Sequence, residues 1–172
     1  MTCAVWDNTS YNQTELIIPE KIIVNNQEYT VTSMFEKAFK GNNSIRKVTL
    51  PSTLTLCGYD AFSGCKNLEY VNFNNGIEVI ADNLFKDCSK LKLVEGLSNV
   101  KTIYNGAFQN CDLELVSFNK LESIGGYNFF NNPSLKKVEI NGSFNTLPGS
   151  SFELCPSLEE VVLPSSCTTI GE

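Results

Sequence analysis

The sequence predicts a single solenoid, a domain of stacked coils built from short β-strands and turns with little helix. One phenylalanine recurs at a nearly fixed spacing of 23 residues, shortened once to 21. It stands at Phe39, Phe62, Phe85, Phe108, Phe129 and Phe152. Other apolar residues keep phase with it: a Leu or Ile follows, and a Val comes three residues later, as in Leu68 and Val71. A repeat of this length is typical of coils that stack around one continuous core.

The composition fits one packed domain and excludes several classes of partner. The chain has 172 residues, and 42% of them are apolar, which is enough for a packed interior. A net charge of −6 and the lack of a basic run disfavour nucleic acid as a partner. No stretch approaches the roughly 20 apolar residues of a membrane-spanning helix, so membrane insertion by this segment is not expected. The first seven residues do not resemble a secretory signal peptide.

Residues 1–30 differ from the rest and are predicted to form an N-terminal cap. Residues 16–19 read Leu-Ile-Ile-Pro and match the end of a repeat, which indicates a degenerate zeroth coil. Two β-prone runs, residues 22–24 and 29–31, flank an Asn-rich turn and predict a β-hairpin. Because an open solenoid end exposes core side chains and strand edges, we expect this segment to cover that end.

Residues 31–166 are predicted to form six repeats. In the motif Leu68-x-x-Val71-x-Phe73, the alternation places Val71 and Phe73 inside a strand, and a turn follows. A second apolar pair, such as Ile77 and Ile80, suits a brief strand or a tight turn on the opposite wall.

Two places depart from this pattern. The third repeat has Gly96 at an inward position, and we expect a local bulge that turns Leu97 inward. Residues 167–172 open a seventh repeat, which favours a fragment of a longer array over an end that pairs with another molecule.

A Cys or an Asn stands three residues after each repeat phenylalanine. The residues are Cys65, Cys88, Cys111 and Cys155, with Asn42 and Asn132 in the first and fifth repeats. A column of stacked cysteines cannot pair fully, and Asn suits a side chain that bonds to backbone at a turn. We therefore expect buried free thiols rather than disulfides. Cys57 and Cys167 occupy core positions and are also expected to be buried.

The unit Ile-Tyr-Asn-Gly-Ala-Phe-Gln-Asn-Cys at residues 103–111, followed by Leu, Val and a turn containing Pro or Asn, resembles the BspA-like leucine-rich repeat family. The resemblance covers roughly residues 14–172. It implies a right-handed, curved leucine-rich repeat solenoid, located outside the cell or at its surface. Members of this family are linked to adhesion to host matrix proteins or to neighbouring bacteria. The family has no shared catalytic residue.

The residues themselves give no sign of catalysis, a metal site or a cofactor. The chain contains no His, which removes the commonest general base and metal ligand. It has no Cys-x-x-Cys pair, and its adjacent carboxylates, Glu159 and Glu160, lie on a strand expected to be exposed. We therefore predict no catalytic, metal-binding or cofactor-binding residue, and no enzyme.

The residue after each motif Leu alternates in charge along the array. The column is Arg46, Glu69, Lys92, Glu114, Lys136 and Glu159. Stacked opposite charges would fix the register between coils, and a charged recognition stripe is the alternative.

The next column gives the candidate binding patch. Tyr70, Leu93 and Leu115 would point outward side by side, with Asn72, Glu95 and Ser117 as a polar rim. Exposed apolar residues in a row are typical of a protein-binding surface, although they could serve only packing between coils. The prediction is therefore a non-catalytic protein-binding or adhesion module, with a host matrix or bacterial surface protein as the partner. The alternatives are a structural spacer and a glycan-binding accessory domain, for which outward aromatics such as Tyr104 are too few.

Overall fold

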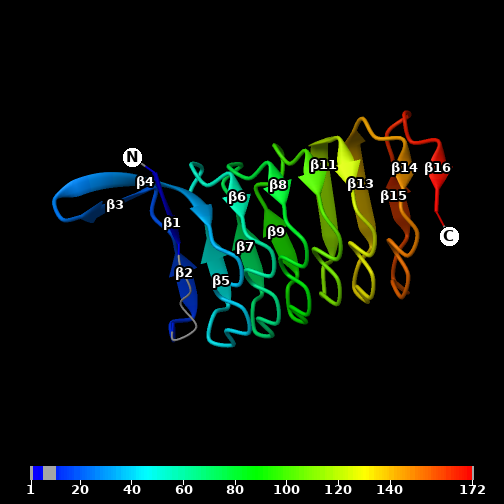
Figure 1. Cartoon of the computed structure of the whole chain (residues 1–172). Helices are drawn as coiled ribbons and strands as arrows, with labels where there is room; N and C mark the ends of the chain where they lie inside the picture. The colour runs from blue at the N-terminus through cyan, green and yellow to red at the C-terminus, as the bar shows by residue number, and fades with distance from the viewer. Residues whose placement is uncertain (1, 6–10, 172) are drawn as a thin grey trace.

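A computed structural model describes the backbone of residues 2–5 and 11–171. The described residues form strands joined by turns and no helix, and successive coils lie side by side from the blue N-terminal end to the red C-terminal end (Figure 1). The predicted β-solenoid is therefore confirmed. A helix able to span a membrane is absent from the described residues.

Two walls of parallel strands make up the coils. The first wall contains β2 (Glu15–Ile17), β5 (Lys47–Thr49), β7 (Tyr70–Asn72), β9 (Leu93–Glu95), β11 (Leu115–Leu121), β13 (Lys137–Gly142) and β15 (Glu160–Val162). The second wall contains β1 (Thr2–Val5), β4 (Gln27–Met34), β6 (Leu56–Cys57), β8 (Val79–Ile80), β10 (Thr102–Ile103), β12 (Ser123–Ile124), β14 (Thr146–Leu147) and β16 (Thr169–Ile170). β3 (Lys21–Val24) pairs antiparallel with β4. The two-residue strands are the brief second-wall segments that the sequence predicts.

The ladders are interrupted at different coils on the two walls. On the first wall, one ladder ends at β9 and the next begins at β11. On the second wall, the ladder ends at β12, and β14 and β16 form a separate pair. Across each interruption the opposite wall remains paired, β10 with β12 and β11 with β13. The fourth coil, which is two residues short, lies between the two interruptions.

The repeat phenylalanines form one continuous stack, as predicted. Neighbouring ring centroids are 5.5 to 5.8 Å apart, and neighbouring rings are within 18° of parallel. The first five rings are buried, and Phe152 is half-buried at the C-terminal end. Val71 pairs with Val48 and with Val94 on the adjacent coils, and all three are buried. The period of the sequence thus sets both the core and the strand register.

Each phenylalanine stands between two backbone bends with positive φ. The residues two positions before it are Lys37, Asp60, Asn83, Gly106, Tyr127 and Ser150. The residues two positions after it are Gly41, Gly64, Asp87, Asn110, Asn131 and Leu154. Left-handed residues at both sides interrupt any helix and turn the chain around the ring.

A side chain of each coil bonds to the coil before it. The thiols of Cys65, Cys88, Cys111 and Cys155 donate to the carbonyl oxygen of the preceding coil's phenylalanine, at 3.0 to 3.2 Å. Asn132 Nδ2 makes the same bond, to Phe108 O at 2.9 Å, and Asn132 Oδ1 in addition accepts from Leu113 N at 3.2 Å. Six cysteines are free, as predicted: Cys57, Cys65, Cys88, Cys111, Cys155 and Cys167. Burial raises the pKa of Cys65 to about 12, which keeps its thiol protonated as a donor. Cys167, expected to be buried, is only half-buried because it lies in the last coil.

The zeroth coil predicted from residues 16–19 is present. β2 pairs with β5 so that Leu16 lies opposite Val48, and Leu16 is buried. Tyr11 takes the place of the repeat phenylalanine: its ring meets Phe39 edge-on at 6.2 Å, and its carbonyl accepts from Asn42 Nδ2 at 2.7 Å. Sequence reasoning missed this role of Tyr11, because no phenylalanine marks the position.

The predicted hairpin is also present, as β3 and β4. Asn25 and Asn26 have φ of 51° and 61°, the conformation that a two-residue type I′ turn requires. Its expected covering role is not confirmed, since the hairpin extends away from the coils and leaves Ile23 and Val24 exposed (Figure 1). Residues 1 and 6–10 of the predicted cap lie outside the described residues.

In the third coil Leu97 turns inward as the sequence predicts, although β9 pairs with β7 in continuous register, without the expected bulge. Gly96 has a φ of +76°, and a Cβ there would lie 2.6 Å from the backbone nitrogen of Asn74. This position therefore requires glycine. The turn it makes brings Leu97 into the core, where it is buried.

Candidate protein-binding surface

The candidate patch lies on the outer face of β7, β9 and β11. Tyr70 pairs with Leu93 and Asn72 with Glu95, so residues of one column occupy adjacent strands. Alternation along each strand buries Val71 and Val94 and turns their neighbours outward. The structure therefore brings the first two coils of the predicted patch together as the sequence indicates.

Leu115 and Ser117, on β11, lie across the first-wall interruption from the rest of the patch. Glu114 N donates to Lys92 O at 3.2 Å, and the side chains of these residues form an ion pair at 3.3 Å. Leu115 and Leu93, the next residues of each strand, are thus held on neighbouring coils. On its other side Leu115 pairs with Lys137, and Ser117 pairs with Glu139. All six predicted residues lie on one wall.

Exposure differs among the three apolar residues. Leu115 has 55% of its surface exposed, whereas Tyr70 and Leu93 are half-buried. The Tyr70 hydroxyl donates to the Glu95 carboxylate on the next coil. This hydrogen bond, together with partial burial, raises the pKa of Tyr70. Tyr70 therefore remains a neutral donor near neutral pH, and its hydroxyl is held at the next coil, where Leu93 and Glu95 lie.

The predicted charge column forms ion pairs at two of its steps among the described residues. Arg46 and Glu69 are 2.7 Å apart, and Lys92 and Glu114 are 3.3 Å apart. Lys137 instead pairs with Glu160 at 3.1 Å, in the neighbouring column. These side chains are largely solvent-exposed, so each pair contributes only about 0.2–1 kcal/mol. The column is consistent with register control and borders the patch with alternating charge.

A second apolar cluster lies on the opposite wall and was missed by sequence reasoning. Phe35, Leu56 and Tyr59 are exposed around a hollow of about 260 Å³. The Lys37 ammonium lies 5.1 Å from the centre of the Tyr59 ring. Leu56 is the outward residue of a two-residue strand, and so short a strand gives no alternation from which its direction could be predicted.

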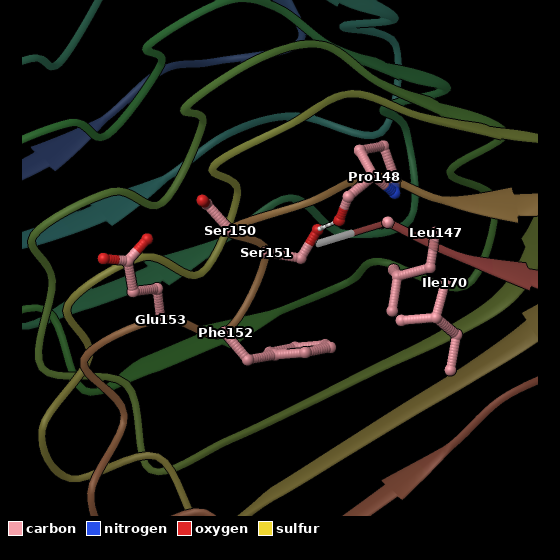
Figure 2. A pocket seen from close by; sticks show the side chains of 8 residues that line it. Leu147, Pro148, Ser150, Ser151, Phe152, Glu153 and Ile170 are labelled. Carbon is pink, nitrogen blue, oxygen red and sulfur yellow. Dashed lines mark hydrogen bonds between the residues drawn. The ribbon is translucent and has the colours of Figure 1, made fainter.

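The C-terminal coil carries a hollow of about 390 Å³ (Figure 2). Figure 2 shows Phe152 and Leu147 with Ile170 around it, and the Ser151 hydroxyl donating to Pro148 O. A neighbouring hollow of about 550 Å³ shares Phe152 and reaches Leu154, Cys155 and Pro156. Among the described residues, Glu153 is the single titratable residue that lines the hollow of about 390 Å³, so these residues offer apolar contact and no acid–base pair.

The described residues contain no group of three or more His, Cys, Asp or Glu side chains arranged to hold a metal ion. Their most strongly shifted titratable groups are the buried thiols, and burial raises the pKa of Cys57 to about 12. A thiol with a raised pKa is a poor nucleophile, because the reactive thiolate is disfavoured. Cys57 is therefore a packing residue of the core.

Comparison with known proteins agrees with this architecture. The BspA type leucine rich repeat region matches the chain in six copies, over residues 10–129 and 98–172. The solved leucine-rich repeat protein of T. pallidum is similar, with a TM-score of 0.85 and 27% identity, over 94% of this chain and 74% of that one. A leucine-rich repeat protein from Bacteroides ovatus has a TM-score of 0.74 and 24% identity, over 92% of this chain. The chain spans about half (48%) of that protein's length. The curated proteins include no match. Since the matched repeats cover nearly all of the sequence, this chain belongs to the BspA-type leucine-rich repeat family.

Proposed function

We propose that this chain is a non-catalytic protein-binding module, located outside the cell or at its surface, that binds a protein partner through Tyr70, Leu93 and Leu115. The partner class is a host matrix protein or a bacterial surface protein. The family resemblance supports the location and the adhesive role. The observation that carries the proposal is the alignment of these three residues on successive coils of one wall.

The shape of the patch supports protein contact. Leu115 offers the apolar area that a partner would bury, and full burial of such a side chain is worth about 1.5–3 kcal/mol. Tyr70 is already oriented by its bond to Glu95, so little side-chain freedom would be lost on binding. Asn72, Glu95 and Ser117 border the apolar residues with hydrogen-bonding groups. An apolar centre with a polar rim is the usual anatomy of an interface.

The alternative is a spacer that holds other parts of a longer protein apart. A spacer needs stable coils but no particular outward residue, so charge reversal on the patch would leave its function unchanged. This difference separates the two functions.

The test is binding of the purified chain to a panel of extracellular matrix and bacterial surface proteins, measured by biolayer interferometry. Leu93→Glu with Leu115→Glu is expected to weaken the interaction at least about 100-fold, because charges would be buried without partners. Leu56→Glu, on the opposite wall, is the matched control and should bind normally. Far-UV circular dichroism verifies that both variants are folded. Unchanged binding by the double variant would remove this patch from the function, and a chain that binds no member of the panel would favour the spacer.

A further inference from the structure

The outer edge of β3 is the most exposed apolar segment of the described chain. Among the described strands, β3 pairs with β4 alone. Ile23 is 73% exposed, the largest value among the exposed large apolar residues, and Val24 beside it is 48% exposed. β3 contains no proline, and its single charge, Lys21, forms an ion pair with Glu28 of β4 at 2.9 Å, so residues 22–24 carry neither of the two devices that usually protect an edge strand.

The hairpin geometry fixes which backbone groups point outward from this edge. The two-residue turn makes Val24 and Gln27 a pair that exchanges hydrogen bonds, and such pairs alternate along the hairpin. The bond from Val31 N to Glu20 O, at 2.8 Å, agrees with this alternation. The N–H and C=O groups of Lys21 and Ile23 therefore face away from β4. They form a short template for another antiparallel strand.

From this edge we infer that β3 pairs antiparallel with β3 of a second copy of the chain, giving a dimer joined through the two hairpins. In the pairing that fits best, Ile22 lies opposite Ile22 of the second copy, and Lys21 lies opposite Ile23. Each chain then satisfies the outward groups of the other, with about four backbone hydrogen bonds in total. The aliphatic part of each Lys21 side chain would cover the Ile23 opposite it.

The other pairings are poorer for physical reasons. A shift of one residue turns the backbone groups to the wrong side. A shift of two in one direction places Lys21 opposite its own counterpart and Ile23 opposite Pro19, which has no N–H to donate. A shift of two in the other direction places Lys21 opposite Asn25, whose φ of 51° removes it from an extended strand. The pairing with Ile22 opposite Ile22 of the second copy is therefore the register that this edge favours.

A second copy suits this edge better than an unrelated strand, because identical antiparallel strands obey two-fold symmetry and every favourable contact occurs twice. The contact is small: β3 has four residues, well below the roughly 800 Å² per partner of a standard interface. The dimer is accordingly weak and concentration-dependent.

Disulfide trapping tests the register. Opposed Ile22 residues would form a pair without mutual hydrogen bonds, with Cα atoms about 4.5 Å apart, a distance that suits a disulfide. Ile22→Cys is expected to give a covalent dimer on mild oxidation, with Cys155 and Cys167 replaced by Ser to lower the background. Ile17→Cys is the control, because Ile17 lies on the first wall and is 63% exposed, whereas Ile22 is half-buried, so exposure alone would favour cross-linking of the control. Equal dimer yields from the two variants would overturn the pairing.

Sedimentation equilibrium tests the dimer without cross-linking. The unmodified chain is expected to show a monomer–dimer equilibrium that Ile23→Pro weakens at least about 10-fold, since proline removes an outward N–H and leaves the bonds between β3 and β4 in place. Leu93→Glu with Leu115→Glu should dimerise normally, so this inference and the proposed function can fail separately. A chain that remains monomeric at millimolar concentration, or an Ile23→Pro variant that dimerises as well as the parent, would refute the inference.

Discussion

Removing one ring from the middle of the phenylalanine stack should cost far more stability than removing the last ring. Phe85 is fully buried between Phe62 and Phe108, with centroids 5.7 and 5.6 Å away, and Phe73 meets it edge-on at 5.9 Å. Phe85→Ala is expected to lower the free energy of unfolding by about 4–5 kcal/mol, the upper part of the range for buried Phe→Ala changes. Phe152 is half-buried with one stacked neighbour, so Phe152→Ala should cost about 2 kcal/mol.

Urea unfolding followed by far-UV circular dichroism measures both costs. A double-mutant cycle with Phe62→Ala and Phe85→Ala should give a coupling energy of at least about 0.5 kcal/mol, because the rings touch. Equal costs for Phe85→Ala and Phe152→Ala, or a coupling energy near zero, would show that contacts between the stacked rings do not hold the coils together.

Three further predictions concern the side chains of Asn132 and Cys65, which bond to the preceding coil, and the close approach of two backbones at Gly58. In urea unfolding Asn132→Cys should cost less than Asn132→Leu, because a thiol can still donate to the carbonyl of Phe108 and leucine cannot. Both variants lose the Oδ1 that accepts from Leu113 N, so Asn132→Cys is expected to cost about 1–3 kcal/mol and Asn132→Leu about 1 kcal/mol more; equal costs would contradict this. The pKa of Cys65 is raised from 9.0 to about 12 in the folded chain, so stability is complete below pH 9 and falls as pH rises toward 12. Cys65→Ala should reduce the loss of unfolding free energy between pH 8 and 10 by about 1.4 kcal/mol, and an unchanged loss would argue against a buried thiol. Gly58→Ala should cost at least about 2 kcal/mol, because its Cβ would lie 2.3 Å from the backbone of the preceding coil; Gly126→Ala, with nothing within 3.8 Å, should change the thermal midpoint little.

The sequence predicts the core of this protein well because the period leaves little freedom. Once Phe62 and Phe85 occupy equivalent positions in stacked coils, their rings must lie one coil apart, and Val71 must lie opposite Val94. The type I′ hairpin at Asn25 and Asn26 is equally local, since few other residues accept positive φ at both positions.

Contacts on the outer surface were harder to predict, because they depend on side chains one or two coils away. Periodicity places Tyr70 outward, but its partial burial follows from its hydroxyl reaching Glu95. Charge alternation predicts a partner for Lys136, yet the ion pair forms one column over, at Lys137 and Glu160. The exposed cluster around Leu56 belongs to a strand too short to show a pattern.

We expect the array to flex most easily at the fourth coil, because the staggered interruptions leave this coil joined to each neighbour by strand pairing on one wall only. The fourth coil is joined to the third by strand pairing on the second wall and to the fifth by strand pairing on the first wall. Bending there can open one wall while the other acts as a hinge. Because the two interruptions lie on opposite walls, strand pairing continues on one wall wherever the ladder of the other wall stops. Tyr70 and Leu93 lie on one side of the first-wall opening and Leu115 on the other. A ligand that contacted both sides would restrict bending at this opening, and amide hydrogen exchange in the fourth coil would slow when the ligand bound.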